Sequence, residues 1–286
     1  MNNPLQQSIQ LADGRVLGYA EYGDPKGKPI FFFPGWPCSR YHAAITDKDA
    51  KTLGLRVLSV DRPGYGLSQF KKDRTLLEFP NDIIELADIL KIIKFSVLGV
   101  SGGGPYAAVC SYSIPERIHK VGIVVGLSPI TLQLLEGTSF LAKFCWSNYH
   151  NFPLLRRTGS IFQYIISTYS PGLGIHRFLW GAKTDKKIYD EKQVRQAAQE
   201  NYKEAFRQGY KGPELDLKLY TDDWGFKVNA IKIPVYLWYG AEDKNVSIKM
   251  GEYYHKQIKK SFLTIYPDEG HLISRTHIAE ILKEFV

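Results

Sequence analysis

A serine flanked by glycines, Gly99-Val-Ser101-Gly102-Gly103, follows an apolar run and precedes a segment with helical spacing. At a turn from a strand into a helix, this G-x-S-x-G pattern exposes the serine hydroxyl above a sheet, where it can act as a nucleophile. The glycines allow a close backbone approach and strained angles that a Cβ would forbid. The pattern alone is not decisive, because a glycine-rich turn of another doubly wound protein also fits it.

A serine hydroxyl is a poor nucleophile at neutral pH, so it needs a base, and the base needs a carboxylate that fixes its tautomer. Farther along the chain, Asp243 and His271 each follow an apolar run typical of a strand. Serine, aspartate, histidine, with the last two just beyond late strands, is a known chain order for such a triad. We therefore predict Ser101 as nucleophile, His271 as base and Asp243 as orienting acid.

Two neighbouring residues are alternatives within this triad. Glu242 could replace Asp243, although it lies one residue nearer the strand, and His277 could replace His271. The segment 126–130, another place where the acid could stand, contains no carboxylate. We therefore prefer Asp243 and His271.

Acyl transfer also needs hydrogen-bond donors for the negative charge that develops on the substrate oxygen. The backbone N–H of Gly102 is one candidate donor. The second is expected in the loop after the apolar run at 30–33, where we choose Trp36, with Gly35 letting the backbone approach the substrate. Prolines on both sides of this pair stiffen the loop. We predict an oxyanion hole formed by Trp36 and Gly102.

The elements that would position these residues follow from the pattern of apolar residues. Short runs rich in β-branched and aromatic residues lie at 30–33, 55–60, 95–100, 121–125, 234–239 and 262–266. Helical spacing occurs at 41–53, 81–93, 103–114 and near 275–286. This alternation predicts an α/β fold with a mostly parallel twisted sheet and helices on both faces.

The alternation is interrupted by a long stretch, 127–231. Since this stretch is too long for a structureless loop inside a compact domain, we predict a helical cap inserted between late strands. The core domain would then comprise 1–126 and 232–286. Aromatic residues of the cap could line an apolar pocket or form the cap's own core: Phe140, Phe144, Trp146, Tyr149, Phe162, Tyr164 and Trp180.

Together, these motifs resemble the α/β-hydrolase fold superfamily, specifically its capped serine hydrolases of the esterase, lipase and peptidase-like kind. The resemblance rests on the loop at 34–37, the stretch 61–68, the Ser101 turn, Asp243 and His271, and it is weakest in the cap. It implies acyl chemistry without a cofactor. A serine rather than an aspartate at the turn argues against epoxide-hydrolase and haloalkane-dehalogenase chemistry.

One residue departs from the pattern of that superfamily. Members usually carry a histidine before the glycine of the oxyanion loop, where this chain has Pro34. Because the predicted donor is a backbone N–H, we expect the oxyanion hole to be retained. The polar groups that support the loop must then differ.

Composition narrows the classes of partner. The 286 residues carry a net charge of +8, but the lysines are scattered, so we expect a solvated basic surface and no nucleic-acid binding. Three cysteines, Cys38, Cys110 and Cys145, form no metal-binding or disulfide pattern. No secretory signal pattern and no run of 18 apolar residues occurs, which predicts a cytoplasmic protein without stable membrane insertion. The expected partner is a small-molecule substrate, and the sequence does not indicate the oligomeric state.

The predicted function is hydrolysis of a carboxylic ester or related acyl bond of a small, apolar substrate by a serine hydrolase. An aminopeptidase or a C–C bond hydrolase could use the same triad. A different class of protein is a ligand-binding member of the fold that turns over slowly or not at all. The natural substrate is not determined by this sequence.

Overall fold

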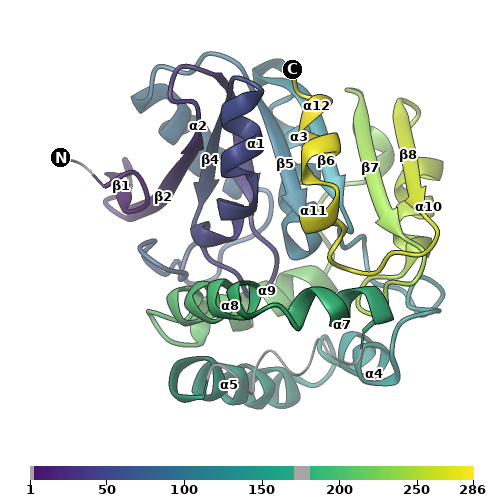
Figure 1. Ribbon diagram of the computed structural model, residues 1–286. Helices are drawn as coiled ribbons and strands as arrows, with labels where there is room; N and C mark the ends of the chain where they lie inside the picture. The colour runs from purple at the N-terminus through teal and green to yellow at the C-terminus, as the bar shows by residue number, and fades with distance from the viewer. Residues whose placement is uncertain (1–2, 171–180) are drawn as a thin grey trace.

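The centre of the molecule is an eight-stranded sheet with helices on both faces (Figure 1). A computed structural model describes residues 3–170 and 181–286. The strand order is β1-β2-β4-β3-β5-β6-β7-β8, in which β2 runs antiparallel to both its neighbours and the other pairs are parallel. The predicted fold class, a mostly parallel sheet covered by helices, is confirmed.

Six strands coincide with the six predicted apolar runs: β3 (Lys28–Phe33), β4 (Leu55–Val60), β5 (Phe95–Val100), β6 (Ile118–Val124), β7 (Val235–Gly240) and β8 (Ser261–Tyr266). Every residue of β5 is buried, as expected where helices cover both faces of a sheet. These strands are parallel, so their carboxyl ends share one edge of the sheet. The loops that carry the predicted site residues leave from that edge.

Two N-terminal strands, β1 (Gln7–Gln10) and β2 (Val16–Gly23), are missing from the sequence-based prediction. The four residues of β1 alternate between half-buried and exposed, and β2 contains glycines and a glutamate, so neither strand is a continuous apolar run. Both extend the sheet antiparallel at one side, far from β7 and β8 in the strand order.

Two sets of helices sandwich the sheet (Figure 1). One apolar cluster joins the sheet to η1 (Arg40–Thr46), α1 (Asp47–Thr52), α11 (Ile273–Thr276) and α12 (Ile278–Lys283). The other joins it to α2 (Phe79–Ile89), α3 (Gly104–Ser113) and α10 (Ile248–Gln257). Short 3₁₀ turns, η2 (Ser101–Gly103) and η3 (Pro115–Arg117), flank α3. Of these helices, α10 is also missing from the prediction.

The chain between β6 and β7 forms a group of helices, called the inserted helices below: α4 (Phe140–Asn148), α5 (Pro153–Tyr169), α7 (Lys183–Tyr189), α8 (Lys192–Ala205), α9 (Lys211–Thr221) and the short η5 (Val228–Ala230). Figure 1 shows α4, α5, α7, α8 and α9 gathered at one end of the sheet, beyond the carboxyl ends of the strands. The division into a core domain and a cap stays a prediction. None of the described helices is long and apolar enough to cross a membrane.

Candidate active site

Ser101 lies in the sharp turn between β5 and α3, with a backbone φ of 53°. A residue with a side chain is strained in this left-handed region, so the surrounding contacts must hold it there. A Cβ added to Gly103 would lie 2.0 Å from the Phe33 carbonyl oxygen, and one added to Gly99 would lie 2.4 Å from the Gly103 carbonyl oxygen. The glycines therefore allow the turn to pack directly against its own backbone and that of β3.

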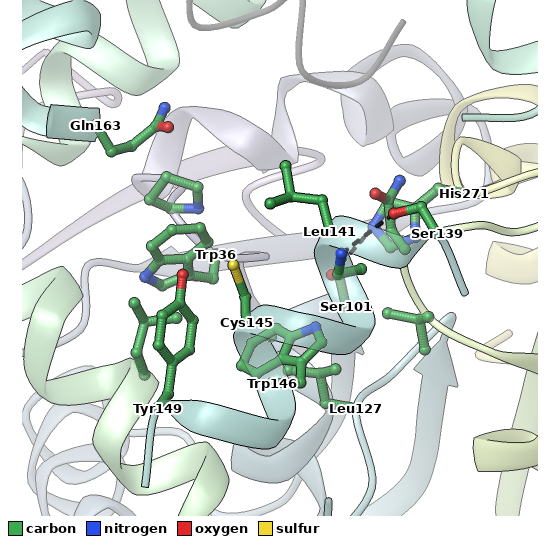
Figure 2. A pocket seen from close by; sticks show the side chains of 16 residues that line it. Trp36, Ser101, Leu127, Ser139, Leu141, Cys145, Trp146, Tyr149, Gln163 and His271 are labelled. Atoms are coloured by element: carbon green, nitrogen blue, oxygen red, sulfur yellow. Dashed lines mark hydrogen bonds between the residues drawn. The ribbon is translucent and has the colours of Figure 1, made fainter. Parts of the chain in front are cut away.

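His271 lies between the other two residues of the predicted triad, and Figure 2 shows its contact with Ser101. Its Nε2 lies 3.1 Å from Ser101 Oγ, and its Nδ1 lies 2.7 Å from Asp243 Oδ2. A proton on Nδ1 is donated to the carboxylate, which leaves Nε2 free to accept the proton of the serine hydroxyl. The geometry therefore suits a nucleophile, a base and an orienting acid in that order.

The loop after β7 holds the Asp243 carboxylate in place. Asp243 Oδ1 accepts hydrogen bonds from the backbone N–H groups of Asn245, at 2.7 Å, and Val246, at 3.0 Å. The side chain is fully buried, so no solvent competes for these acceptor sites. One carboxylate oxygen is thus fixed by its own loop while the other faces His271.

Burial and charge act in opposite directions on His271. Burial favours the neutral imidazole, but the charge and hydrogen bond of Asp243 and the charge of Asp185 outweigh it, so the pKa of His271 is raised above its ordinary value of 6.5. A base with a raised pKa accepts a proton more readily from the serine hydroxyl.

The two sequence alternatives lie elsewhere. The Glu242 carboxylate is more than half exposed and pairs with Lys244 rather than with a histidine. His277 lies between Glu269, at 3.3 Å, and Glu280, at 3.5 Å. The structure therefore brings Asp243 and His271 to Ser101.

The predicted oxyanion donors are adjacent. A Cβ added to Gly102 would lie 2.9 Å from the Trp36 backbone nitrogen, so the loop after β3 and the turn after β5 are in contact. Gly102 is in the first turn of a helical segment, where N–H groups have no acceptor within the helix. The Trp36 indole N–H donates to the Pro213 carbonyl at 2.9 Å, which anchors this loop to α9.

Sequence reasoning did not identify the groups that support the oxyanion loop. The Arg62 guanidinium donates to the carbonyl oxygens of Pro34 and Gly35. The Gly35 N–H donates to His42 Nδ1 at 3.1 Å. Burial, aided by nearby positive charge, lowers the pKa of His42 to about 3, so this imidazole is a neutral acceptor at physiological pH. Arg62 and His42 thus supply the polar support that the loop with Pro34 needs.

A buried ionic cluster links this support to α9. Asp216 accepts from Arg62 Nε at 2.6 Å, from the Tyr65 hydroxyl at 2.7 Å and from the Tyr106 hydroxyl at 2.6 Å, and it also pairs with Arg74. Burial would raise the pKa of Asp216, but the two arginines outweigh it and lower that pKa to about 2. The carboxylate is therefore charged, and it holds Arg62 in the position from which it contacts the oxyanion loop.

A cavity of about 120 Å³ opens at Ser101. This volume is close to that of an engineered apolar cavity of ~150 Å³ that binds benzene. Figure 2 shows Ser101 and His271 at one side of it, with Tyr149 and Gln163 farther away. Most of its lining is apolar, and it includes Trp36 from the loop after β3, Leu127 from the loop after β6, and Leu141, Ala142, Cys145 and Trp146 from α4.

The aromatic residues considered for the pocket lie in different environments. Trp146 and Tyr149 line the cavity. Phe140 and Phe162 are 86% and 60% exposed, and neither they nor Phe144 line it. Tyr164 packs against Phe206 instead, and Trp180 lies outside the described residues. Helical spacing could not separate these groups, because it does not indicate which face of an inserted helix looks toward the site.

Among the described residues, no group of three or more His, Cys, Asp or Glu side chains is arranged to hold a metal ion.

Comparisons with known proteins agree with this architecture. Residues 28–277 match the family model described as alpha/beta hydrolase fold. A bifunctional esterase/perhydrolase from Acinetobacter calcoaceticus is 23% identical over 97% of both chains. A non-heme chloroperoxidase from Streptomyces lividans is 28% identical, but the match covers 44% of this chain and 46% of that protein.

The fold is also similar to that of a solved structure. A hydrolase from Pseudomonas aeruginosa PA01 superimposes with a TM-score of 0.76 at 18% identity, covering 99% of each chain. At this identity the likeness concerns the fold alone. Since the family model spans most of the sequence, the chain belongs to the alpha/beta hydrolase fold family.

Proposed function

We propose that this protein is a serine hydrolase that cleaves a carboxylic ester or a related acyl bond of a small, apolar substrate. The observation that carries the proposal is the hydrogen-bonded series from Asp243 through His271 to Ser101, with a cavity opening at the serine. The esterase named among the full-length relatives supports the same class of reaction.

In the proposed reaction, the Ser101 hydroxyl oxygen attacks the substrate carbonyl while its proton passes to His271 Nε2. The N–H groups of Trp36 and Gly102 donate to the resulting oxyanion. The proton then moves from Nε2 to the leaving alcohol as the ester bond breaks. Water, deprotonated by the same histidine, attacks the acyl-enzyme and releases the acid, and Ser101 regains its proton.

The substrate's size and polarity follow from the cavity. A volume of about 120 Å³ suits a short acyl chain or a single ring, and the side chains from α4 are mainly apolar. We propose that the inserted helices act as a cap over this cavity and that their inner face selects the substrate. The cytoplasmic location predicted from the sequence would give a small, diffusible substrate direct access.

The experiment is hydrolysis of p-nitrophenyl esters of increasing acyl length by the wild type and by Ser101→Ala. We expect turnover that is best for short chains, and a loss of kcat of about 10³-fold or more in Ser101→Ala. Ser113→Ala is the matched control, because Ser113 is an exposed serine at the end of the helix that follows the turn. Ester turnover that persists in Ser101→Ala would show that another group does the chemistry.

The alternatives give different results in the same assay. Ser101-dependent cleavage of amino-acid amides or of C–C bonds, without ester turnover, would indicate a peptidase or C–C bond hydrolase. Because a full-length relative is also named as a perhydrolase, hydrogen peroxide is the first acyl acceptor to compare with water. Ligand binding without any turnover would indicate a binding protein.

A further inference from the structure

A second carboxylate, Asp185, reaches the segment that carries His271. Asp185 is in α7, one of the inserted helices, and only 2% of its surface is exposed. Its Oδ2 accepts from the His271 backbone N–H at 3.0 Å, and its Oδ1 accepts from the Leu272 backbone N–H at 2.9 Å. Both oxygens of one buried carboxylate therefore hold two consecutive amides of the loop that presents the base.

The contact between α7 and this loop is close and depends on a glycine. A Cβ added to Gly270 would lie 2.4 Å from Asp185 Oδ2 and 2.6 Å from Ala182 Cβ. Only a residue without a side chain lets the loop approach the helix at this distance. The position of His271 is thus fixed from two sides, by Asp243 at its ring and by Asp185 at its backbone.

We propose that Asp185 is a positioning residue for the base. Through Asp185, the triad is correctly assembled only when α7 is packed against the core. This inference rests on the proposed function, because it concerns how the same site is held ready. Asp185 makes no contact with Ser101 and acts only through His271. One of the inserted helices thereby also controls the geometry of the base.

Charged and titratable groups lie near His271 on several elements, among them Arg275 in α11, whose positive charge is close to His42 and Tyr189. Asp243 faces the ring from the loop after β7, and Asp185 faces the backbone from α7. The neutral imidazole of His42 lies nearby in η1. The burial of Asp185 raises its own pKa, while its bonds to the two amides and the charge of His271 oppose this. Tyr189, in the same helix, is a further titratable group near Asp185.

The test is Asp185→Asn, with Asp190→Asn as a matched control at the exposed end of the same helix. The asparagine can accept only one of the two N–H groups, because its NH₂ faces the other. We expect kcat on the best ester to fall about 10- to 100-fold, with KM changed less than about threefold.

Losing the negative charge of Asp185 should also lower the pKa of His271, so the acid limb of kcat/KM should move to lower pH by roughly half a unit or more. Asp190→Asn should match the wild type in all three measurements.

Two further measurements separate this role from simple stability and from the proposed function. In Asp185→Glu the charge is kept but the extra methylene crowds Gly270, so kcat should fall while the acid limb stays near that of the wild type. The His271 ring can be titrated by NMR without any substrate, with assignment through His271→Gln. In that titration Asp185→Asn should lower the pKa of His271.

The possible outcomes are distinct. A lower melting temperature with kcat and the acid limb unchanged would show that Asp185 only stabilises the fold, and would overturn the inference. An NMR shift in a protein that cleaves neither esters nor related acyl bonds would refute the proposed function while supporting the positioning role. If Asp185→Asn does not fold, an Asp185→Glu variant with wild-type kcat overturns the inference.

Discussion

The sheet core and the inserted helices bury different kinds of residue. Every residue of β5 is buried, and the residues that α2 and α3 bury are mainly apolar. In α5 the order is reversed: Arg156, Ser160, Gln163 and Ser167 are buried, whereas Leu154, Phe162 and Tyr169 are exposed. Apolar burial thus specifies the core, whereas the inward face of α5 is specified by polar side chains, of which Gln163 lines the cavity.

The sheet core and the inserted helices both supply residues that form or support the candidate active site. The core supplies Ser101, His271 and Asp243, while α7 supplies Asp185 and α9 supplies Asp216. The carboxylates of Asp185 and Asp216 both form hydrogen bonds with groups in loops of the core.

The first prediction compares Asp243, a carboxylate of the core, with Asp185, a carboxylate of the inserted helices. Asp243→Asn leaves His271 without the partner that fixes its tautomer, and such a change costs about 10⁴-fold in kcat in a serine protease. We expect a loss near that size here, at least tenfold greater than that of Asp185→Asn. Single-turnover rates on one activated ester measure both. Equal losses of kcat in the two variants would contradict the proposal that Asp243 fixes the His271 ring while Asp185 holds only its backbone.

The second prediction concerns the buried ionic cluster. Asp216→Ala leaves Arg62 and Arg74 buried without their carboxylate, so we expect the free energy of unfolding to fall by about 3–5 kcal/mol. Because folding lowers the pKa of Asp216 from 3.8 to about 2, its contribution is fully present above the unfolded value and is lost only as the pH falls toward the folded one. It should therefore be constant between about pH 5 and pH 8. Denaturant unfolding at several pH values measures this. Glu200→Ala, an exposed carboxylate in α8, is the control and should cost little.

The third prediction compares two phenylalanines. Phe31 in β3 is fully buried and packs edge-on against Phe95 at 4.6 Å between ring centroids, so Phe31→Ala should cost about 3–5 kcal/mol. Phe162 in α5 is 60% exposed, and Phe162→Ala should cost less than about 1 kcal/mol. Urea unfolding of the two variants gives both values. Similar costs would mean that the outer face of α5 is packed against something in solution.

The smallest effect is expected at a glycine. Gly159 lies inside α5, and an added Cβ would meet only the Tyr149 hydroxyl oxygen at an ordinary 3.7 Å. Gly159→Ala should therefore stabilise the protein by about 0.5–1 kcal/mol. Gly103→Ala is the counterpart in the core and should destabilise it, since its Cβ would collide with Phe33. Melting temperatures should move in opposite directions.

Sequence patterns predicted the core better than the inserted helices. Each of the six parallel strands contains a short apolar run, and Ser101, Asp243 and His271 lie in the turn or loop that follows β5, β7 and β8, so the edge where they meet could be predicted. The short, alternating β1 carried no such signal. Asp185 stands in an ordinary charged helix, Lys183-Thr-Asp-Lys-Lys187, and nothing in that sequence indicates its contact with the amides at 271 and 272. Pairings between distant loops and helices become visible only in the tertiary structure.

The most direct test of the account is covalent labelling by a fluorophosphonate, followed by peptide mapping. This reagent reports an activated serine without requiring the natural substrate. We expect one adduct per chain, located at Ser101, absent in Ser101→Ala and greatly slowed in His271→Gln. No adduct on the folded wild type, or an adduct on another residue that survives Ser101→Ala, would contradict it.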